Sequence, residues 1–188
     1  MLLALLLTAA PTAASAEAMA AKKQWDELYL AWAAVKPDAV ADADKKRVAK
    51  TLAKGCAALA GSDAVMAQSL GEKAVAFAED ADAFLCAAKA SAKNEQRSEG
   101  EALLRTGRKL FPSDDRFALE LGRLLLSEND SAGALKELQA IGPKSKQKKE
   151  AALLLKKAAA LEAQAGAARA EVRAVEKRLN NQELAAAR

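Results

Sequence analysis

A chain of 188 residues is long enough for one domain with a real core, and aromatic residues make up only 4% of this one, while alanine is abundant. Alanine favours helices, and few β-branched or aromatic runs exist from which a sheet could form. The formal net charge of +4 does not by itself argue for nucleic acid, and the absence of histidine removes the commonest general base and metal ligand. We therefore expect an all-α protein.

The first residues have the composition of a secretory signal peptide. An apolar core over 2–10 is followed by small residues at 14–16, which suit cleavage before Glu17. No lysine or arginine precedes the apolar core, and the alternative is an ordinary buried N-terminal helix. We predict a cleavable signal peptide over 1–16, no transmembrane span after its removal, and a periplasmic or secreted protein.

The predicted helices follow one another between turn signals. A first helix over 18–35 ends before Pro37. Further helices are expected at 45–60, 64–78, 81–92, 101–111, 117–126 and 132–140, with a last pair at 149–165 and 167–179. A turn at Gly166 separates that last pair. Asn129 and Asp130 are expected to stop one helix and cap the next.

An aromatic stripe on the first helix holds Trp25, Tyr29 and Trp32. Such a stripe can be a binding hot spot. We interpret it instead as core, with the N-terminal helix packing as a cap onto the first helical hairpin.

Cys56 and Cys86 are the only cysteines, and both lie in apolar helical patterns. The sequence leaves two alternatives open, a disulfide that export would permit and two small buried thiols. Two cysteines without histidine cannot complete a zinc site, so we expect no metal and no cofactor.

The helical pattern recurs about every 34 residues. Segments 47–80, 81–114, 115–148 and 149–182 follow one another without a gap. Three aligned columns are apolar throughout: Ala53, Ala87, Leu121, Leu155; Cys56, Ala90, Leu124, Ala158; and Leu70, Leu104, Leu138, Val172. Stacked helical hairpins need such columns, because each hairpin buries its face only against its neighbours.

In this register the chain resembles the tetratricopeptide repeat family, best over 81–148. The residues at the family's small and proline positions are Gly122, Ala134, Ala168 and Pro112. Lys54 and Lys156 depart from the pattern, at the small eighth position of the first and last repeats. The resemblance implies a right-handed α-solenoid of antiparallel hairpins, with 17–46 as capping helix and linker and 183–188 as tail. A generic antiparallel helical bundle is the alternative.

The resemblance also implies an interaction module that binds a peptide or a partner protein in a concave groove. The chain carries none of the phosphate-loop, dinucleotide, zinc-protease or nucleophile-elbow motifs. We therefore expect no enzyme, but a non-catalytic protein–protein interaction adaptor.

The family's ninth position, which faces the groove, is basic in three repeats, at Lys89, Arg123 and Lys157. Lys93 and Arg116 are expected near the same surface. Cations held on helices form charge-assisted hydrogen bonds to carboxylates, which favours an acidic partner segment. An ordinary solvated face is the alternative.

A second basic segment begins at Lys144 and ends at Lys157. Such segments can bind nucleic acid or anionic lipid, which is the alternative function. No aromatic residue interleaves with these lysines for base stacking, so we expect a solvated turn and regard nucleic acid as a disfavoured partner. Residues 168–188 predict an amphipathic capping helix that could also pair with a partner helix.

Overall fold

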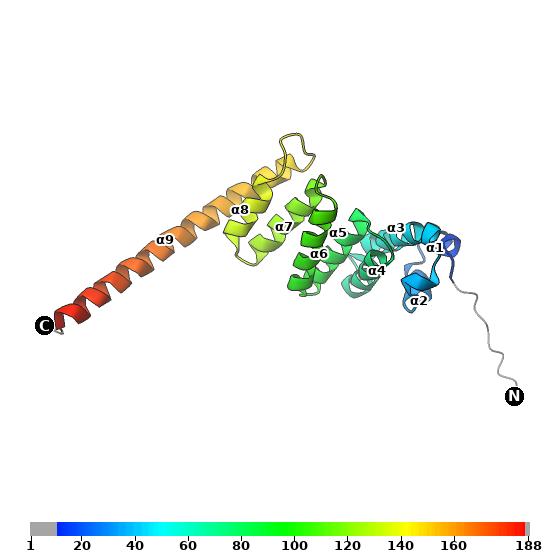
Figure 1. Cartoon of the computed structure of the whole chain (residues 1–188), viewed down its shortest axis with the longest axis horizontal. Coiled ribbons are helices and arrows are strands. Elements are labelled where there is room, and N and C mark those ends of the chain that lie inside the picture. Colours follow the sequence, from blue (N-terminus) through cyan, green and yellow to red (C-terminus); the bar gives the residue numbers. More distant parts are fainter. Residues whose placement is uncertain (1–10, 187–188) are drawn as a thin grey trace, which may run out of the picture. The chain divides into compact units, whose positions relative to one another are not determined.

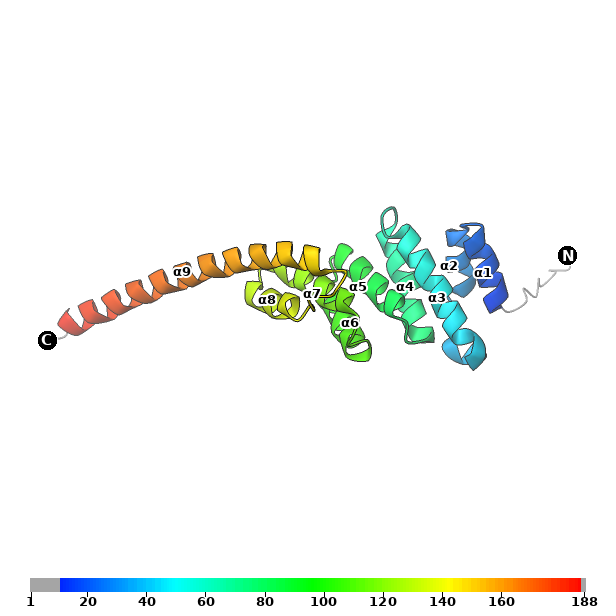
Figure 2. The same ribbon diagram turned by 90° about the horizontal axis from the view of Figure 1, so that it is seen from above.

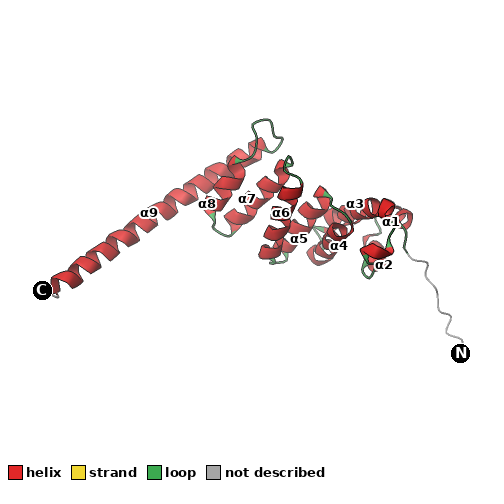
Figure 3. Cartoon of the chain, in the orientation of Figure 1, coloured by secondary structure: helices red, strands yellow, loops and turns green. Residues whose placement is uncertain are grey.

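The computed structural model describes the backbone of residues 11–186 and the side chains of residues 11–179. No strand occurs among these residues, so the expected all-helical structure is confirmed (Figure 3). The α-helices are α1 (Ala13–Ala21), α2 (Trp25–Trp32), α3 (Asp42–Leu59), α4 (Ala64–Phe77), α5 (Ala81–Lys93), α6 (Arg97–Leu110), α7 (Asp115–Ser127), α8 (Ser131–Gln139) and α9 (Lys148–Ala186) (Figure 1). One 3-10 turn, η1 (Pro37–Ala39), lies between α2 and α3. Among the described helices, none is long and apolar enough to cross a membrane.

The chain divides into two compact units, residues 1–117 and 118–188, which we call unit 1 and unit 2. In unit 1 each helix from α3 to α6 packs on the next, and α3 also contacts α5. Helices α1 and α2 both pack on α3, and their buried side chains join a core that runs on through α4 and α5. In unit 2, apolar side chains of α7, α8 and α9 form a second core.

The helices recur with the predicted spacing. The first residues of α5 and α7, Ala81 and Asp115, are 34 residues apart, and so are those of α6 and α8, Arg97 and Ser131. The aligned apolar columns are buried through the first three segments: Leu70, Leu104 and Leu138 are each at most 2% exposed. These columns therefore hold the helices together, as expected of packed hairpins.

The single helix predicted over 18–35 is wrong, because the chain turns between α1 and α2. Lys23 takes a left-handed backbone conformation, with φ of 57°, and Gln24 donates its backbone N–H to the carbonyl of Met19 at 3.0 Å. No glycine or proline marks this turn in the sequence. Packing of α1 and α2 on α3 stabilises this turn, which the local sequence does not favour.

The predicted pair of helices around Gly166 is also wrong, because α9 runs unbroken from Lys148 to Ala186. One glycine inside a helix costs only about 1 kcal/mol relative to alanine, and Ala165 and Ala167 on either side are strong helix formers. The fourth segment therefore has no second helix. Val172, expected in a buried column, is 57% exposed.

The predicted cleavage region of the signal peptide lies within α1, while residues 1–10 lie outside the described residues. Thr12 caps α1, since its hydroxyl accepts the backbone N–H of Ser15 at 3.1 Å. Ala13 and Ala16 are buried in the core of unit 1, at 3% and 0% exposure. Residues 13–16 thus contribute to packing in the uncleaved chain.

Candidate functional site

The aromatic stripe on α2 is part of the core, as we predicted from the sequence. Trp32 is fully buried and meets the ring of Phe77 edge-on, with ring centroids 5.6 Å apart. Trp25 and Tyr29 are half-buried and pack against the same core. The Trp32 indole nitrogen has no hydrogen-bond partner among the described residues.

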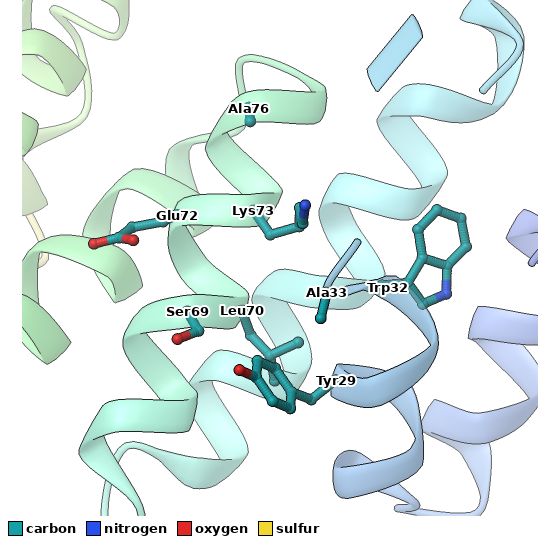
Figure 4. Close-up of a pocket in the computed structure, with 8 residues that line it drawn as sticks. All are labelled: Tyr29, Trp32, Ala33, Ser69, Leu70, Glu72, Lys73 and Ala76. Carbon is teal, nitrogen blue, oxygen red and sulfur yellow. The ribbon is translucent and has the colours of Figure 1, made fainter. Parts of the chain in front are cut away.

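An open cleft of about 370 Å³ lies between α2 and α4, which the sequence did not predict (Figure 4). Its lining residues are Tyr29, Trp32, Ala33, Ser69, Leu70, Glu72, Lys73 and Ala76. The ring of Tyr29 lies beside Leu70 on one wall (Figure 4). Lys73 Nζ donates to the Val35 carbonyl at 2.9 Å, and Glu72 accepts from the Gln68 amide at 2.7 Å. The cleft therefore offers apolar contact, while its charged groups already have partners in the fold.

Cys56 of α3 and Cys86 of α5 are joined by a disulfide, with their Cα atoms 6.2 Å apart. This decides between the two alternatives that the sequence left open. The bond links two helices that belong to successive repeats, across 30 residues of sequence. The disulfide cross-links α3 and α5 in the interior of unit 1, because both cysteine side chains are buried.

Lys93 and Arg116, predicted near the groove, both make contacts within unit 1. Lys93 Nζ donates to the Ala60 carbonyl at 2.6 Å, at the end of α3. Arg116 donates to Asp114 and to Asp82, each at 2.6 Å. Because those hydrogen bonds from Arg116 outweigh the effect of partial burial, the pKa of Asp114 lies below its usual value.

The 34-residue period of the sequence indicates the contact between Arg116 and Asp82. Asp82 precedes Arg116 by one 34-residue period, so an acid and a base occupy the first turns of successive first helices. Packed hairpins bring such positions together. Lys89 lies on α5 in unit 1 with an exposed side chain.

The structure brings Arg123 and Lys157 to one face of unit 2. The guanidinium of Arg123, on α7, forms an ion pair with Glu150 of α9 and lies 3.8 Å from a carboxylate oxygen of Glu120. Lys157 follows Glu150 by seven residues, which places it on the same side of α9 and about 10.5 Å further along the axis. Arg123 contacts Glu120 and Glu150, and Lys157 lies on the same side of α9 as Glu150. We call these two cations the Arg123–Lys157 face.

The basic segment from Lys144 to Lys157 has six lysines, all exposed: Lys144, Lys146, Lys148, Lys149, Lys156 and Lys157. The one acid within it, Glu150, pairs with Arg123 on α7. The segment thus presents a strong positive charge to solvent at the start of α9.

No cluster of three or more histidine, cysteine, aspartate or glutamate side chains that could hold a metal ion occurs in the described part of the chain. Among protein-family models, curated proteins and solved structures, none matches this chain. The case for a function therefore rests on the residues themselves.

Proposed function

We propose that the protein is a non-catalytic adaptor, a tetratricopeptide-like α-solenoid that binds an acidic segment of a partner protein. The observation that carries this proposal is the Arg123–Lys157 face. Two cations that the repeat register singled out lie on one side of one unit, although they belong to different helices.

The spacing of the cations on this face supports a ligand with two separated carboxylates. Glu150 and Glu120 both lie against the guanidinium of Arg123. Because a guanidinium has five N–H donors, others remain for a carboxylate of the partner. Lys157 lies about 10.5 Å along α9 from Glu150, which an extended chain spans in about three residues. We therefore propose a partner segment with two acidic residues about three positions apart. The exposed Lys149 and Lys156 add attraction.

Binding of a fluorescent oligoglutamate peptide to the full chain, followed by fluorescence anisotropy, tests this site. The Arg123→Gln/Lys157→Gln variant is expected to bind about tenfold more weakly, the equivalent of about 1.4 kcal/mol. The control is Lys46→Gln/Lys50→Gln, which removes the same charge from exposed positions of α3. Equal losses in both variants would mean that net charge alone attracts the peptide, and would overturn the assigned site.

The exposed lysines at 144–157 favour a second candidate function, binding of nucleic acid or anionic lipid. A DNA oligonucleotide and vesicles with anionic lipid, used in the same assay, test it. Steep weakening with added salt and loss of binding in Lys144→Gln/Lys146→Gln/Lys148→Gln would support this candidate. Binding to both probes tighter than to oligoglutamate would count against the adaptor.

We further propose that the protein is exported, with cleavage before Glu17. The Cys56–Cys86 disulfide supports this, because such bonds persist in oxidising compartments and are rare in the cytosol. The test is the mass and thiol content of the protein recovered from its native cells. We expect a chain that begins at Glu17, in an envelope or extracellular fraction, with thiols that react with maleimide only after reduction. A full-length chain with two reactive thiols in the cytosolic fraction would contradict export.

A further inference from the structure

Among the described residues of unit 2, the second half of α9 has no packing partner. Helix α8 is short, and Figures 1 and 2 both show α9 extending well beyond it. Ala158 is fully buried in the core of unit 2, and Leu161 packs against that core. The apolar stripe continues past Leu161 to Leu179, about 27 Å further along the helix. Its exposed members include Val172, Val175 and Leu179, at 57%, 52% and 53% exposure.

The stripe has the spacing of a coiled-coil seam. Its members alternate at intervals of three and four residues: Ala158, Leu161, Ala165, Ala168, Val172, Val175 and Leu179. This heptad pattern turns one side of a helix into a continuous apolar strip that a second helix can cover. A helical segment without tertiary packing is only marginally stable in water, so the exposed half of α9 gains most from such a cover.

The charges beside the seam identify the second helix. Arg169 and Glu176 flank it on one side, and Glu171 and Arg178 flank it on the other. In an antiparallel pair of identical helices, each flank faces the same flank of the other copy. Arg169 then meets Glu176 and Glu171 meets Arg178, and the two-fold symmetry repeats both attractive pairs.

We propose that the second half of α9 pairs with the same segment of a second copy of this chain, as an antiparallel two-helix coiled coil. A parallel pair would set Glu171 of each copy against Glu176 of the other, which is repulsive on both sides. In the antiparallel pair Leu179 packs over Ala168 of the other copy, and Val172 packs over Val175. At each outer layer of the pair the large Leu179 therefore meets the small Ala168. At the centre two valines of equal size meet.

The ion pairs already present are compatible with this arrangement. Arg169 pairs with Glu162 and donates to the Ala165 carbonyl at 3.2 Å, so its guanidinium is held beside the seam. A guanidinium has five donors, and those left over can reach Glu176 of the other copy. Glu162 in turn accepts from Ser131 of α8 at 2.6 Å, which ties this part of α9 to the core of unit 2.

Sedimentation equilibrium of the full chain tests the proposal, and a charge series tests the orientation. We expect a reversible dimer. Glu171→Arg should weaken the dimer at least about tenfold, because it sets two arginines together, and Glu171→Arg/Arg178→Glu should restore it. Lys177→Glu, a charge reversal on the side of α9 away from the seam, should leave the dimer unchanged.

Three results would overturn the proposal. One is a monomer at every concentration. Another is a dimer that Glu171→Arg strengthens, as relief of the Glu171–Glu176 repulsion in a parallel pair requires. The last is a dimer that survives Val172→Asp/Val175→Asp unchanged, because that variant places carboxylates in the centre of the seam.

Discussion

Two residues with left-handed backbones end successive first helices in the same way. Glu95 and Asn129 have φ of 65° and 63°, and they are one 34-residue period apart. After each of them the next backbone N–H closes back onto the helix, from Gln96 to Ser91 and from Asp130 to Leu125, both at 2.9 Å. This closure satisfies a terminal carbonyl, but an L-residue pays for the left-handed conformation unless it is glycine.

Replacement of Glu95 tests this strain. Glu95→Gly should raise the free energy of unfolding by about 1 kcal/mol over Glu95→Ala, because only glycine adopts positive φ without a steric penalty. Urea unfolding of both variants measures the difference. A glycine variant no more stable than the alanine variant would show that this conformation carries no strain.

The contact of Arg116 with Asp114 predicts a pH dependence. Hydrogen bonds from Arg116 hold the pKa of Asp114 below its value in the unfolded chain. Its contribution to stability is therefore present above the unfolded pKa and is lost as the pH falls through the folded pKa. Acidification from neutral pH to below about 4 should therefore lower the free energy of unfolding of Arg116→Gln less than that of the unaltered protein. The difference between the two should be under about 1 kcal/mol, because the pair is partly exposed.

Urea unfolding at the two pH values measures this effect, with Lys109→Gln as the charge-matched control. Lys109 is exposed on α6. Identical pH dependence in Arg116→Gln and in the unaltered protein would refute the role of the pair.

At the scale of helices, α4 and α5 touch through backbone at Gly71. A Cβ on Gly71 would lie 2.8 Å from the Cα of Ala87, closer than such atoms approach in proteins. Gly71→Ala should therefore lower the free energy of unfolding by about 1–2 kcal/mol, since the clash exceeds the gain in helix propensity. Gly61→Ala is the control, because nothing lies within 4 Å of its Cβ and its φ is not positive. Thermal unfolding that ranks Gly71→Ala at or above this control would contradict the close approach.

The disulfide between α3 and α5 should contribute strongly to the stability of unit 1. It closes a loop of 30 residues in the unfolded chain, which corresponds to about 3.6 kcal/mol. We expect Cys56→Ala/Cys86→Ala to lower the free energy of unfolding by about that amount. Reducing agent should do the same to the unaltered protein and nothing to the variant. Destabilisation of the variant by reducing agent would show that the loss has another cause.

At the scale of the whole molecule, the sequence predicts the helices that recur with the 34-residue period. It misses features that occur only once. The 34-residue period gives the order and spacing of α5 to α8, because each hairpin must bury the same positions. The turn at Lys23 and the unbroken α9 follow from tertiary packing and summed propensity, which no local motif reports. For the same reason the register selects Arg123 and Lys157 but does not show that Arg123 forms an ion pair with Glu150.

The two parts of α9 have separate proposed roles. Its first half carries the Arg123–Lys157 face on the core of unit 2, and its second half carries the proposed dimer seam. The charge changes that test one part leave the other part intact.

The most direct test of the proposed function is to locate the bound acidic peptide by NMR. Backbone amide shifts of the isotope-labelled full chain would be followed while oligoglutamate is added. We expect the largest changes on α7 around Arg123 and on α9 between Glu150 and Lys157, with smaller ones along the lysines from 144 to 149. Changes centred on the cleft between α2 and α4, or spread evenly over all exposed lysines, would contradict the Arg123–Lys157 face as the binding site.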